Sequence, residues 1–225
     1  MEPTQRGRLI TIEGIDGVGK TTQIEQIGEF LRASRISYAV YREPGSTPLG
    51  EELRRILKAG PGQTPLAELL LFAAARVELV STRVLPELSR GVWVILDRFA
   101  DSMLAYQGAL GGVDDELLAA VTTLSRCGLS PDLTLWFDLP PELAAERSAA
   151  APDRIVMAEV GEMPLDAIER RASGYHRRVR ERYAALQAAE PQRIISVDAS
   201  LPLPDVTLAV VSIVRGKVEE WKSQG

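Results

Sequence analysis

Short runs of β-branched and other apolar residues alternate along the chain with longer segments in which apolar side chains recur at helical spacing. The continuously apolar runs are typical of strands that are covered on both faces. This alternation predicts an α/β fold of three layers, in which helices flank a parallel, doubly wound sheet of five strands. The expected strands cover residues 9–12, 38–42, 92–96, 133–137 and 193–197.

The segments between these strands predict helices, and the length of the chain predicts how they are organised. At roughly 100 to 200 residues per domain, the 225 residues fit a single domain spanning 1–225. The stretch from about 149 to 170 contains two prolines and a glycine and is expected to be a mobile lid. The expected helices cover residues 20–33, 49–57, 67–88 with a bend or break at Pro86, 117–124, 141–151, 166–189 and 206–221.

Charge and composition narrow the choice of partners. Acidic residues outnumber basic ones by 31 to 26, which gives a net charge of -5. Without a positive global field we expect no nucleic acid and no anionic membrane as partner. The single cysteine, Cys127, and the single histidine, His176, argue against an internal disulfide and a Cys/His zinc site. A polar start at residues 1–8, with no apolar run of about 18 residues, predicts a cytoplasmic protein.

A glycine-rich motif follows the first predicted strand and opens the first predicted helix. It reads G-x-x-x-x-G-K-[ST], and in this context such a loop binds the phosphates of a nucleoside triphosphate. Lys20 is expected to reach the β and γ phosphates, and Thr21 to bind Mg²⁺ together with Asp97, which ends an apolar strand. The predicted ATP-binding residues here are Gly14, Ile15, Asp16, Gly17, Val18, Gly19, Lys20, Thr21 and Thr22.

Five segments in order give the chain a resemblance to the thymidylate kinase family, whose members carry the P-loop NTPase fold. The first is the glycine loop with its flanks, residues 13–23. The others are Arg-Glu-Pro-Gly at 42–45, Phe-x-x-x-Arg at 72–76, Asp-Arg-Phe at 97–99 with the residues up to Gln107, and residues 131–139. The resemblance implies phosphoryl transfer from MgATP to dTMP, giving ADP and dTDP, and a homodimer.

The resemblance also implies a role for each matching residue in the acceptor site. Phe72 would stack on thymine and Arg76 would pair with the base, while Arg98 would bind the acceptor phosphate. Tyr106 and Gln107 would close over the sugar and base. The implied dTMP-binding residues are Asp16, Arg42, Pro44, Phe72, Arg76, Arg98, Ser102, Tyr106 and Gln107, and those implied in catalysis are Asp16, Lys20, Arg98 and Arg154.

Elementary phosphate chemistry agrees with such a reaction. A nucleoside monophosphate carries about two negative charges near neutral pH, since the second pKa of a phosphate monoester is near 6. Its oxygen is therefore already a nucleophile and needs no general base. A chain with a single histidine can perform this transfer if arginines, Lys20 and Mg²⁺ neutralise charge and align the phosphates.

The lid is expected to supply an arginine finger, because Gly17 stands where some family members carry a catalytic arginine. Arg147 resembles the residue that stacks on adenine, and Arg154 resembles the finger. A second alignment places the family element at residues 166–169, where alanine replaces the arginine. Arg170 or Arg171 would then compensate from the next turn.

Two other functions fit the same motifs. A neighbouring kinase that acts on deoxynucleosides would need a carboxylate to take the proton of the sugar hydroxyl, and Glu13 is the nearby candidate. A nucleotide-gated binding or regulatory protein whose altered lid has lost its chemistry would bind ATP without transferring phosphate.

Overall fold

The computed structural model describes residues 6–59, 63–150 and 173–223. Its five strands form one sheet in the order β2-β3-β1-β4-β5, and every neighbouring pair is parallel. This confirms the predicted parallel five-stranded sheet. The strands are β1 Leu9–Glu13, β2 Tyr38–Arg42, β3 Trp93–Asp97, β4 Leu133–Asp138 and β5 Ile194–Asp198.

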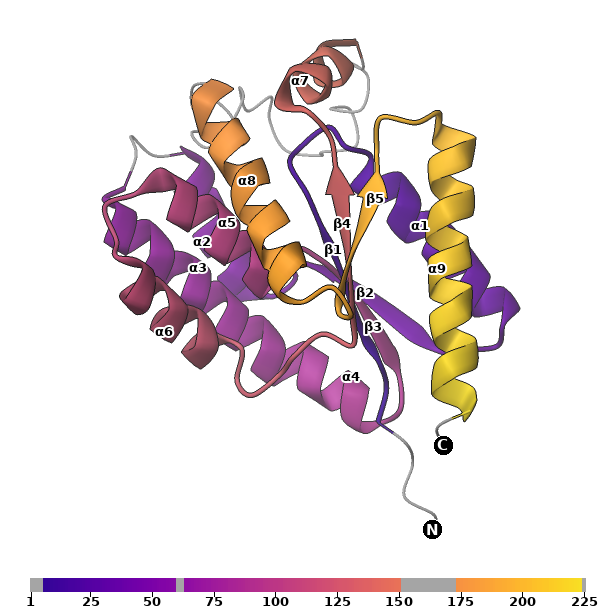
Figure 1. Cartoon of the computed structure of the whole chain (residues 1–225). Coiled ribbons are helices and arrows are strands. Elements are labelled where there is room, and N and C mark those ends of the chain that lie inside the picture. The colour runs from indigo at the N-terminus through magenta and orange to yellow at the C-terminus, as the bar shows by residue number, and fades with distance from the viewer. Residues whose placement is uncertain (1–5, 60–62, 151–172, 224–225) are drawn as a thin grey trace.

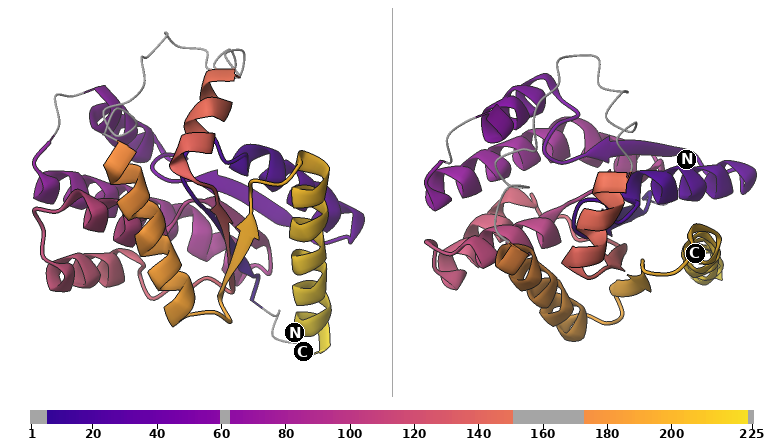
Figure 2. Two further views of the ribbon diagram at one scale, coloured as in Figure 1. Left: turned by 45° about the horizontal axis from the view of Figure 1, so that its top comes forward. Right: turned by 90° about the horizontal axis from the view of Figure 1, so that it is seen from above.

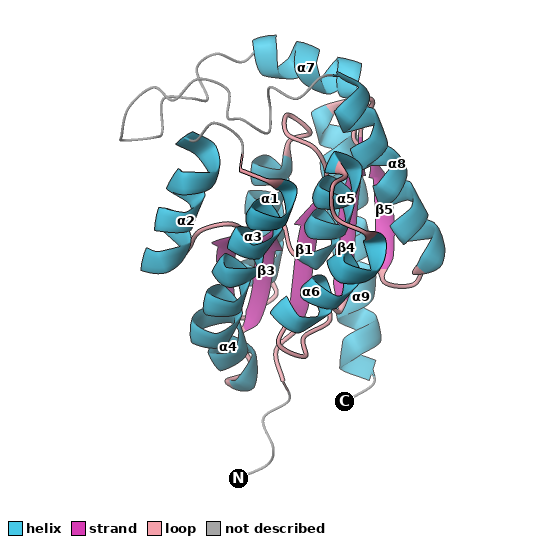
Figure 3. Cartoon of the chain, turned by 90° about the vertical axis from the view of Figure 1, so that its left-hand side faces the viewer, coloured by secondary structure: helices cyan, strands magenta, loops and turns pink. Residues whose placement is uncertain are grey.

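Helices cover both faces of the sheet and complete the three layers (Figure 1). Two of them, α1 (Lys20–Ala33) and α9 (Leu203–Ser223), lie together on one face, as two further views show (Figure 2). The other face is seen from the front in Figure 3, with the strands behind the helices. It carries α2 (Pro48–Ala59), α3 (Pro65–Leu79), α4 (Leu85–Ser89), α5 (Ala100–Leu110), α6 (Asp115–Ser125) and α8 (Ser173–Ala189), while α7 (Pro141–Ala150) follows the carboxyl end of β4.

The segment around Pro86 stays helical, with an irregular turn directly before the proline where a bend or break was expected. The helix continues from α3 through a π-helical turn, Val80–Val84, into α4. Leu85 donates its backbone N–H to the carbonyl of Val80, five residues back, in the wide spacing of a π turn. Pro86 follows this wide turn directly, so the irregularity in the helical hydrogen bonds lies next to the residue that has no N–H.

Helix α5 is absent from the sequence prediction. It is buried on several sides at once, between α3, α6 and α8, so polar as well as apolar side chains lie inside. A helix covered on all sides lacks the one-sided apolar stripe by which an amphipathic helix is found. Its sequence from 100 to 110 therefore gave no helical signal, although it carries three of the predicted acceptor-site residues.

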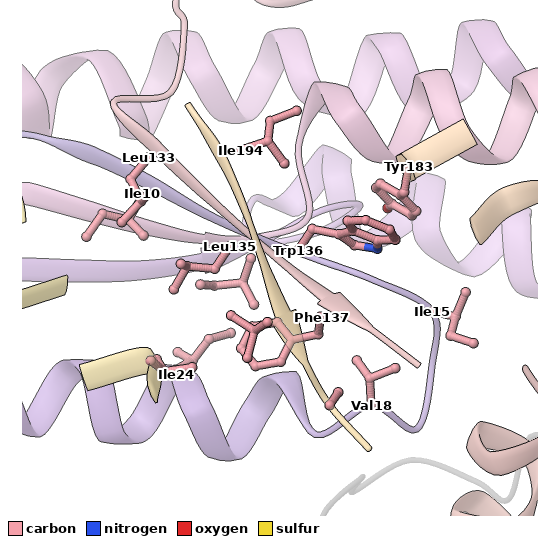
Figure 4. Packing of buried hydrophobic residues seen from close by; sticks show 14 of the residues in the cluster. Ile10, Ile15, Val18, Ile24, Leu133, Leu135, Trp136, Phe137, Tyr183 and Ile194 are labelled. Carbon is pink, nitrogen blue, oxygen red and sulfur yellow. The ribbon is translucent and has the colours of Figure 1, made fainter. Parts of the chain in front are cut away.

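The core lies on both faces of β4, whose side chains alternate between the two helical layers. Figure 4 shows Trp136 beside Tyr183 of α8, and Phe137 on the other side, near Val18 and Ile24. The rings of Trp136 and Tyr183 stack with centroids 6.0 Å apart and planes 19° from parallel. This packing fixes α8 against the sheet directly beneath the loops that follow the strands.

The strand order determines where chemistry can occur. Because β1 lies between β3 and β4, the loop after β1 and the loop after β3 leave the sheet side by side at its carboxyl end. Ligands of open α/β sheets bind at such a point. The predicted lid falls mainly on residues 151–172, which lie outside the described residues. Within the ranges described, no helix is both long enough and apolar enough to cross a bilayer.

Candidate active site

The loop between β1 and α1 takes a backbone path that requires glycine. Gly14, Gly17 and Gly19 have φ values of 136°, 81° and 90°, in the region that other residues avoid. A Cβ atom at Gly14 would also lie 2.7 Å from the carbonyl oxygen of Phe137. The loop can therefore turn tightly onto the N-terminus of α1, where the helix dipole favours an anion.

Lys20 is held inside this loop. Its Nζ donates to the carbonyl oxygens of Gly14 and Ile15 at 3.2 and 3.0 Å, and lies 3.6 Å from Oδ1 of Asp16. Burial, and then the neighbouring charge of Arg98, lower the pKa of Lys20. The ammonium group is thus surrounded by carbonyl oxygens that a triphosphate can replace as acceptors.

Two side chains near the loop fit a magnesium ion. Oδ1 of Asp97 is buried at the end of β3 and has no hydrogen-bond partner among the described residues. Thr21 lies in the first turn of α1 with its side chain exposed. No group of three or more His, Cys, Asp or Glu residues gathers as a metal site in the described ranges. This sparse set suits Mg²⁺, which commonly binds one or two protein oxygens besides substrate phosphates and water.

A cavity next to the loop gathers the predicted acceptor-site residues, with the exception of Arg42. Its walls come from the glycine loop, the turn after β2, and helices α2, α3 and α5. The predicted residues that line it are Asp16, Pro44, Phe72, Arg76, Arg98, Ser102, Tyr106 and Gln107. Glu43, from the Arg-Glu-Pro-Gly segment named above, also lines it. Sequence reasoning missed the other lining residues, Arg54, Leu57, Lys58 and Met103.

Arg98 connects the glycine loop to this cavity. It has a left-handed backbone with φ of 72°. Its Nη2 donates to Oδ1 of Asp16 at 2.7 Å and its Nη1 to Oγ of Ser102 at 3.2 Å, while the guanidinium lies 4.8 Å from the centre of the Tyr106 ring. Burial alone would raise the pKa of Asp16, but Arg98 and then Lys20 outweigh it and hold that pKa well below its usual value. Asp16 is therefore ionised and orients both cations.

Arg76 is bound inside the chain more completely than its predicted role suggests. Nε donates to Oε2 of Glu43 at 2.8 Å, and Nη2 donates to the carbonyl oxygen of Phe99 at 3.0 Å. Nη2 also lies 2.7 Å from Oε2 of Glu43, in a buried ion pair. Nη1 approaches Sδ of Met103 and Oγ of Ser125 at 3.4 and 3.3 Å. Each of the three guanidinium nitrogens thus donates at least one hydrogen bond. The implied pairing of Arg76 with a base stays a prediction, and it requires exchange of one of these bonds.

Two aromatic side chains offer surfaces to a ligand. Phe72 is half-buried and packs against the cluster of Leu69 and Met103. The Tyr106 hydroxyl is buried and has no hydrogen-bond partner among the described residues. Burial raises the pKa of Tyr106, so the phenol keeps its proton and can donate it. A buried, unpaired hydroxyl at the wall of a cavity indicates a polar ligand there.

Two predicted residues lie outside this cavity, and a third is not among the described residues. Arg42 is exposed and pairs with Glu51 at 3.1 Å. Arg147 of α7 donates to the carbonyl oxygens of Ala199 and Ser200 at 2.6 and 3.2 Å, in the connection between β5 and α9. Arg154, the expected finger, lies outside the described residues, as do Arg170 and Arg171.

The spacing of three lining residues that were not predicted could have indicated them. Arg54, Leu57 and Lys58 are spaced three and four residues apart, so they share one face of α2. That face turns toward the cavity, and Arg54 also donates to the carbonyl oxygen of Pro44 at 3.0 Å.

Comparison with known proteins decides the family. The profile described as thymidylate kinase matches residues 12–210. The chain belongs to the thymidylate kinase family. A thymidylate kinase from Alkalilimnicola ehrlichii is 41% identical over 97% of both chains, and one from Pelodictyon phaeoclathratiforme is 42% identical over 93% of both. The crystal structure of thymidylate kinase from Ehrlichia chaffeensis is 28% identical and superposes with a TM-score of 0.70, over 93% of this chain and 99% of that one.

Beneath the site of this family member lies a buried carboxylate, Glu13, at the end of β1. Its Oε1 accepts from the backbone N–H of Phe99 at 2.8 Å, and its Oε2 accepts from Ser102 and Tyr183 at 2.5 and 2.8 Å. Burial, and then the charge of Asp101, raise the pKa of Glu13 to about 7, against the lowering effects of Ser102, Arg98 and Tyr183. Glu13 thus holds the hydroxyl of Ser102, which in turn accepts a hydrogen bond from Arg98.

This raised pKa predicts a dependence of stability on pH. The folded chain keeps the Glu13 proton up to about pH 7, whereas the unfolded chain loses it near 4.5, so ionisation of Glu13 lowers the free energy of unfolding as pH rises between these values. Glu13→Gln removes that loss. We expect its stability relative to the unchanged protein to improve by on the order of 3 kcal/mol from pH 5 to pH 8.

Urea denaturation of both proteins at the two pH values measures this difference. Glu52→Gln is the matched control, since Glu52 is an exposed carboxylate that pairs with the exposed Arg55. A Glu13→Gln stability difference that stays constant across the two pH values contradicts the assignment.

Proposed function

We propose that this chain transfers the γ-phosphoryl group of MgATP to dTMP and releases ADP and dTDP. Membership of the thymidylate kinase family supports the reaction. The observation that carries the acceptor is the cavity beside the glycine loop, in which an aromatic ring, Phe72, and a cation bound to the loop, Arg98, lie on the same walls. A flat base and a phosphate at the end of one ligand match these two features.

In the proposed mechanism, an oxygen of the dTMP phosphate attacks the γ phosphorus as the bond to the β-phosphate bridging oxygen breaks. Arg98 holds the acceptor phosphate with its planar, two-pronged donor set. Lys20 leaves its carbonyl acceptors for the β and γ phosphates and stabilises the charge that develops on them. The nucleophile already carries its negative charge, so no side chain has to remove a proton.

Thr21 and Asp97 are the residues proposed to hold Mg²⁺. The unpaired buried oxygen of Asp97 and the exposed Thr21 side chain support this assignment. When bound, the ion supplies positive charge to the phosphate oxygens and helps to align them.

The structure disfavours a deoxynucleoside as acceptor. Such a reaction needs a carboxylate with a free lone pair beside the sugar hydroxyl. Glu13 is completely buried, is not among the residues that line the cavity, and already accepts three hydrogen bonds. It is bound as a structural acceptor and not presented to a substrate.

A screen of acceptors tests the proposed function. The protein is mixed with ATP, Mg²⁺ and one acceptor at a time, and ADP release is followed by a coupled assay. We expect release with dTMP, and little with thymidine or with no acceptor. ATP binding without dTMP-dependent ADP release would instead support a regulatory protein that has lost its chemistry, and thymidine as the better acceptor would support a deoxynucleoside kinase.

We further propose a homodimer, which the resemblance implies and an apolar stripe supports. Leu66, Leu70 and Val77 are exposed on α3 at intervals of four and seven residues, so they form one stripe along the helix. Leu124 of the neighbouring helix α6 is 78% exposed. A second copy of the chain is the proposed partner of this surface.

Leu70→Glu is expected to dissociate the dimer, because it places a charge from each copy in the apolar contact. Light scattering should then give a mass near 24.6 kDa in place of twice that value. Leu208→Glu, at an exposed leucine of α9 in the opposite layer, is the control and should leave the dimer intact. A mass that Leu70→Glu does not change contradicts this interface, and a monomeric unchanged protein contradicts the dimer.

A further inference from the structure

Gln107 of α5 lines the acceptor cavity and is bound from behind by a carboxylate. Its Nε2 donates to Oε1 of Glu68 at 3.0 Å, and the two side chains are almost completely buried, with 3% and 2% of their surfaces exposed. No sequence motif had drawn attention to Glu68. A buried carboxylate that binds the amide of a cavity residue influences how that amide is oriented toward the cavity.

The contact fixes which end of the amide is which. An amide side chain can turn by 180° and exchange its oxygen for its nitrogen. A carboxylate only accepts hydrogen bonds, so Glu68 binds the nitrogen of Gln107 and rejects its oxygen. With its nitrogen bound to Glu68, Gln107 has its oxygen as the other polar end of the amide at the cavity wall. The cavity wall therefore carries a hydrogen-bond acceptor whose position cannot be exchanged for a donor.

Helix α3 places this pair next to the proposed base site. Glu68, Phe72 and Arg76 follow each other at intervals of four residues, so they share one face of the helix. Phe72 and Arg76 line the cavity, and Glu68 reaches it through Gln107 one turn earlier. The fixed amide thus lies beside the ring on which a base would stack.

Pyrimidines differ in the hydrogen-bonding edge that such an amide meets. Thymine and uracil present an N3–H donor next to an O4 acceptor, whereas cytosine presents an N3 acceptor next to an N4 donor. An amide whose oxygen and nitrogen cannot exchange places forms hydrogen bonds with one of these edges. Against the other edge, it sets acceptor against acceptor and donor against donor. Burying unmatched polar groups is costly, which is how polar sites discriminate between close analogues.

We propose that Glu68 is a positioning residue that makes the acceptor site selective for pyrimidines with an N3–H, by holding the Gln107 amide oxygen toward the base. The inference rests on the proposed function, in which a pyrimidine monophosphate occupies this cavity. It separates thymine and uracil from cytosine and does not separate thymine from uracil, because their N3 and O4 groups are the same.

The test is Glu68→Gln, which keeps the size of the side chain and lets either end of Gln107 find a partner. We expect kcat/KM for dCMP relative to dTMP to rise by about tenfold or more, since the amide can now turn to match cytosine. The ratio for dUMP relative to dTMP should change by less than about twofold. General damage to the site would move dUMP and dCMP alike, so the two ratios isolate the effect of amide polarity.

Glu52→Gln serves as the matched control, because Glu52 is 66% exposed and lies away from the cavity. If Glu68→Gln does not fold, Gln107→Leu carries the test: without an amide, the preference for dTMP over dCMP should shrink by about tenfold while the dUMP ratio holds. An unchanged dCMP ratio in a folded variant overturns the proposal, as does a dUMP ratio that shifts with it. If the unchanged protein transfers no phosphate to dTMP, the proposed function fails instead.

Discussion

Replacing Lys20 with alanine is expected to lower kcat by about 10³ or more while leaving dTMP binding nearly unchanged. The expected size follows from other groups that stabilise charge on a transferring phosphoryl group. Lys20 lies in the glycine loop and is absent from the walls of the acceptor cavity, so the acceptor should still bind. Single-turnover kinetics with saturating ATP and dTMP measure the chemical step, and calorimetry measures dTMP binding.

The same variant should not lose stability, and this separates a functional residue from a structural one. Burial and Arg98 lower the pKa of Lys20, so its charged form is disfavoured in the folded chain. Its removal takes away that cost, while Asp16 keeps its ion pair with Arg98. Lys222→Ala, at an exposed lysine near the end of α9, is the control. Turnover within tenfold of the unchanged protein would remove Lys20 from the mechanism.

Arg98→Ala is expected to reduce kcat/KM for dTMP by about 10³, mainly through weaker acceptor binding. The variant loses the two-pronged donor for the acceptor phosphate. It also leaves Asp16, which is ionised, close to a phosphate with Lys20 as its remaining cation. Repulsion between the two anions adds to the loss. Arg98→Lys keeps the charge without the planar fork, so it should lie between the two, at about a 10²-fold reduction.

Initial rates at varied dTMP concentration give kcat/KM for dTMP. The affinity for ATP alone should change by less than about twofold, because Arg98 contacts the acceptor side. Arg55→Ala is the matched control, since Arg55 is exposed on α2 and pairs with Glu52. Equal losses for dTMP and ATP in Arg98→Ala would indicate that the loop itself had collapsed.

The sequence predicts the sheet well because its signals are local. Each strand is a short apolar run with a polar end, and the glycine loop has a fixed spacing between strand and helix. Helix α5 escapes this reasoning, because it is buried on several sides and shows no stripe. This unpredicted helix places Ser102, Tyr106 and Gln107 along the cavity. Their positions relative to one another could therefore not be predicted from the hydrophobic pattern.

The site residues also fall into two groups, those that a local motif indicates and those that only the folded structure brings into contact. Residues in a motif, such as Arg98 and Phe72, could be named from the sequence by resemblance. Glu68, and the pairing of Glu43 with Arg76, could not, because each depends on a hydrogen bond accepted from a residue at least 33 positions away in the chain. Nothing in the local sequence distinguishes such a buried acceptor from a solvated glutamate on a helix or turn. The hydrogen bonds of Arg76 to Phe99, Met103 and Ser125 cannot be predicted from the sequence for the same reason.

The shared contact of Asp16 with Lys20 and Arg98 has a consequence for the order of events at the two nucleotide sites. When a triphosphate binds Lys20, the Asp16 carboxylate keeps Arg98 as its remaining partner of the two. When a monophosphate binds Arg98, the carboxylate interacts mainly with Lys20. Each ligand thereby alters the electrostatic environment that the other meets. Thermodynamic reciprocity then requires donor and acceptor to change each other's affinity by one common factor, so the two substrates do not bind as independent events.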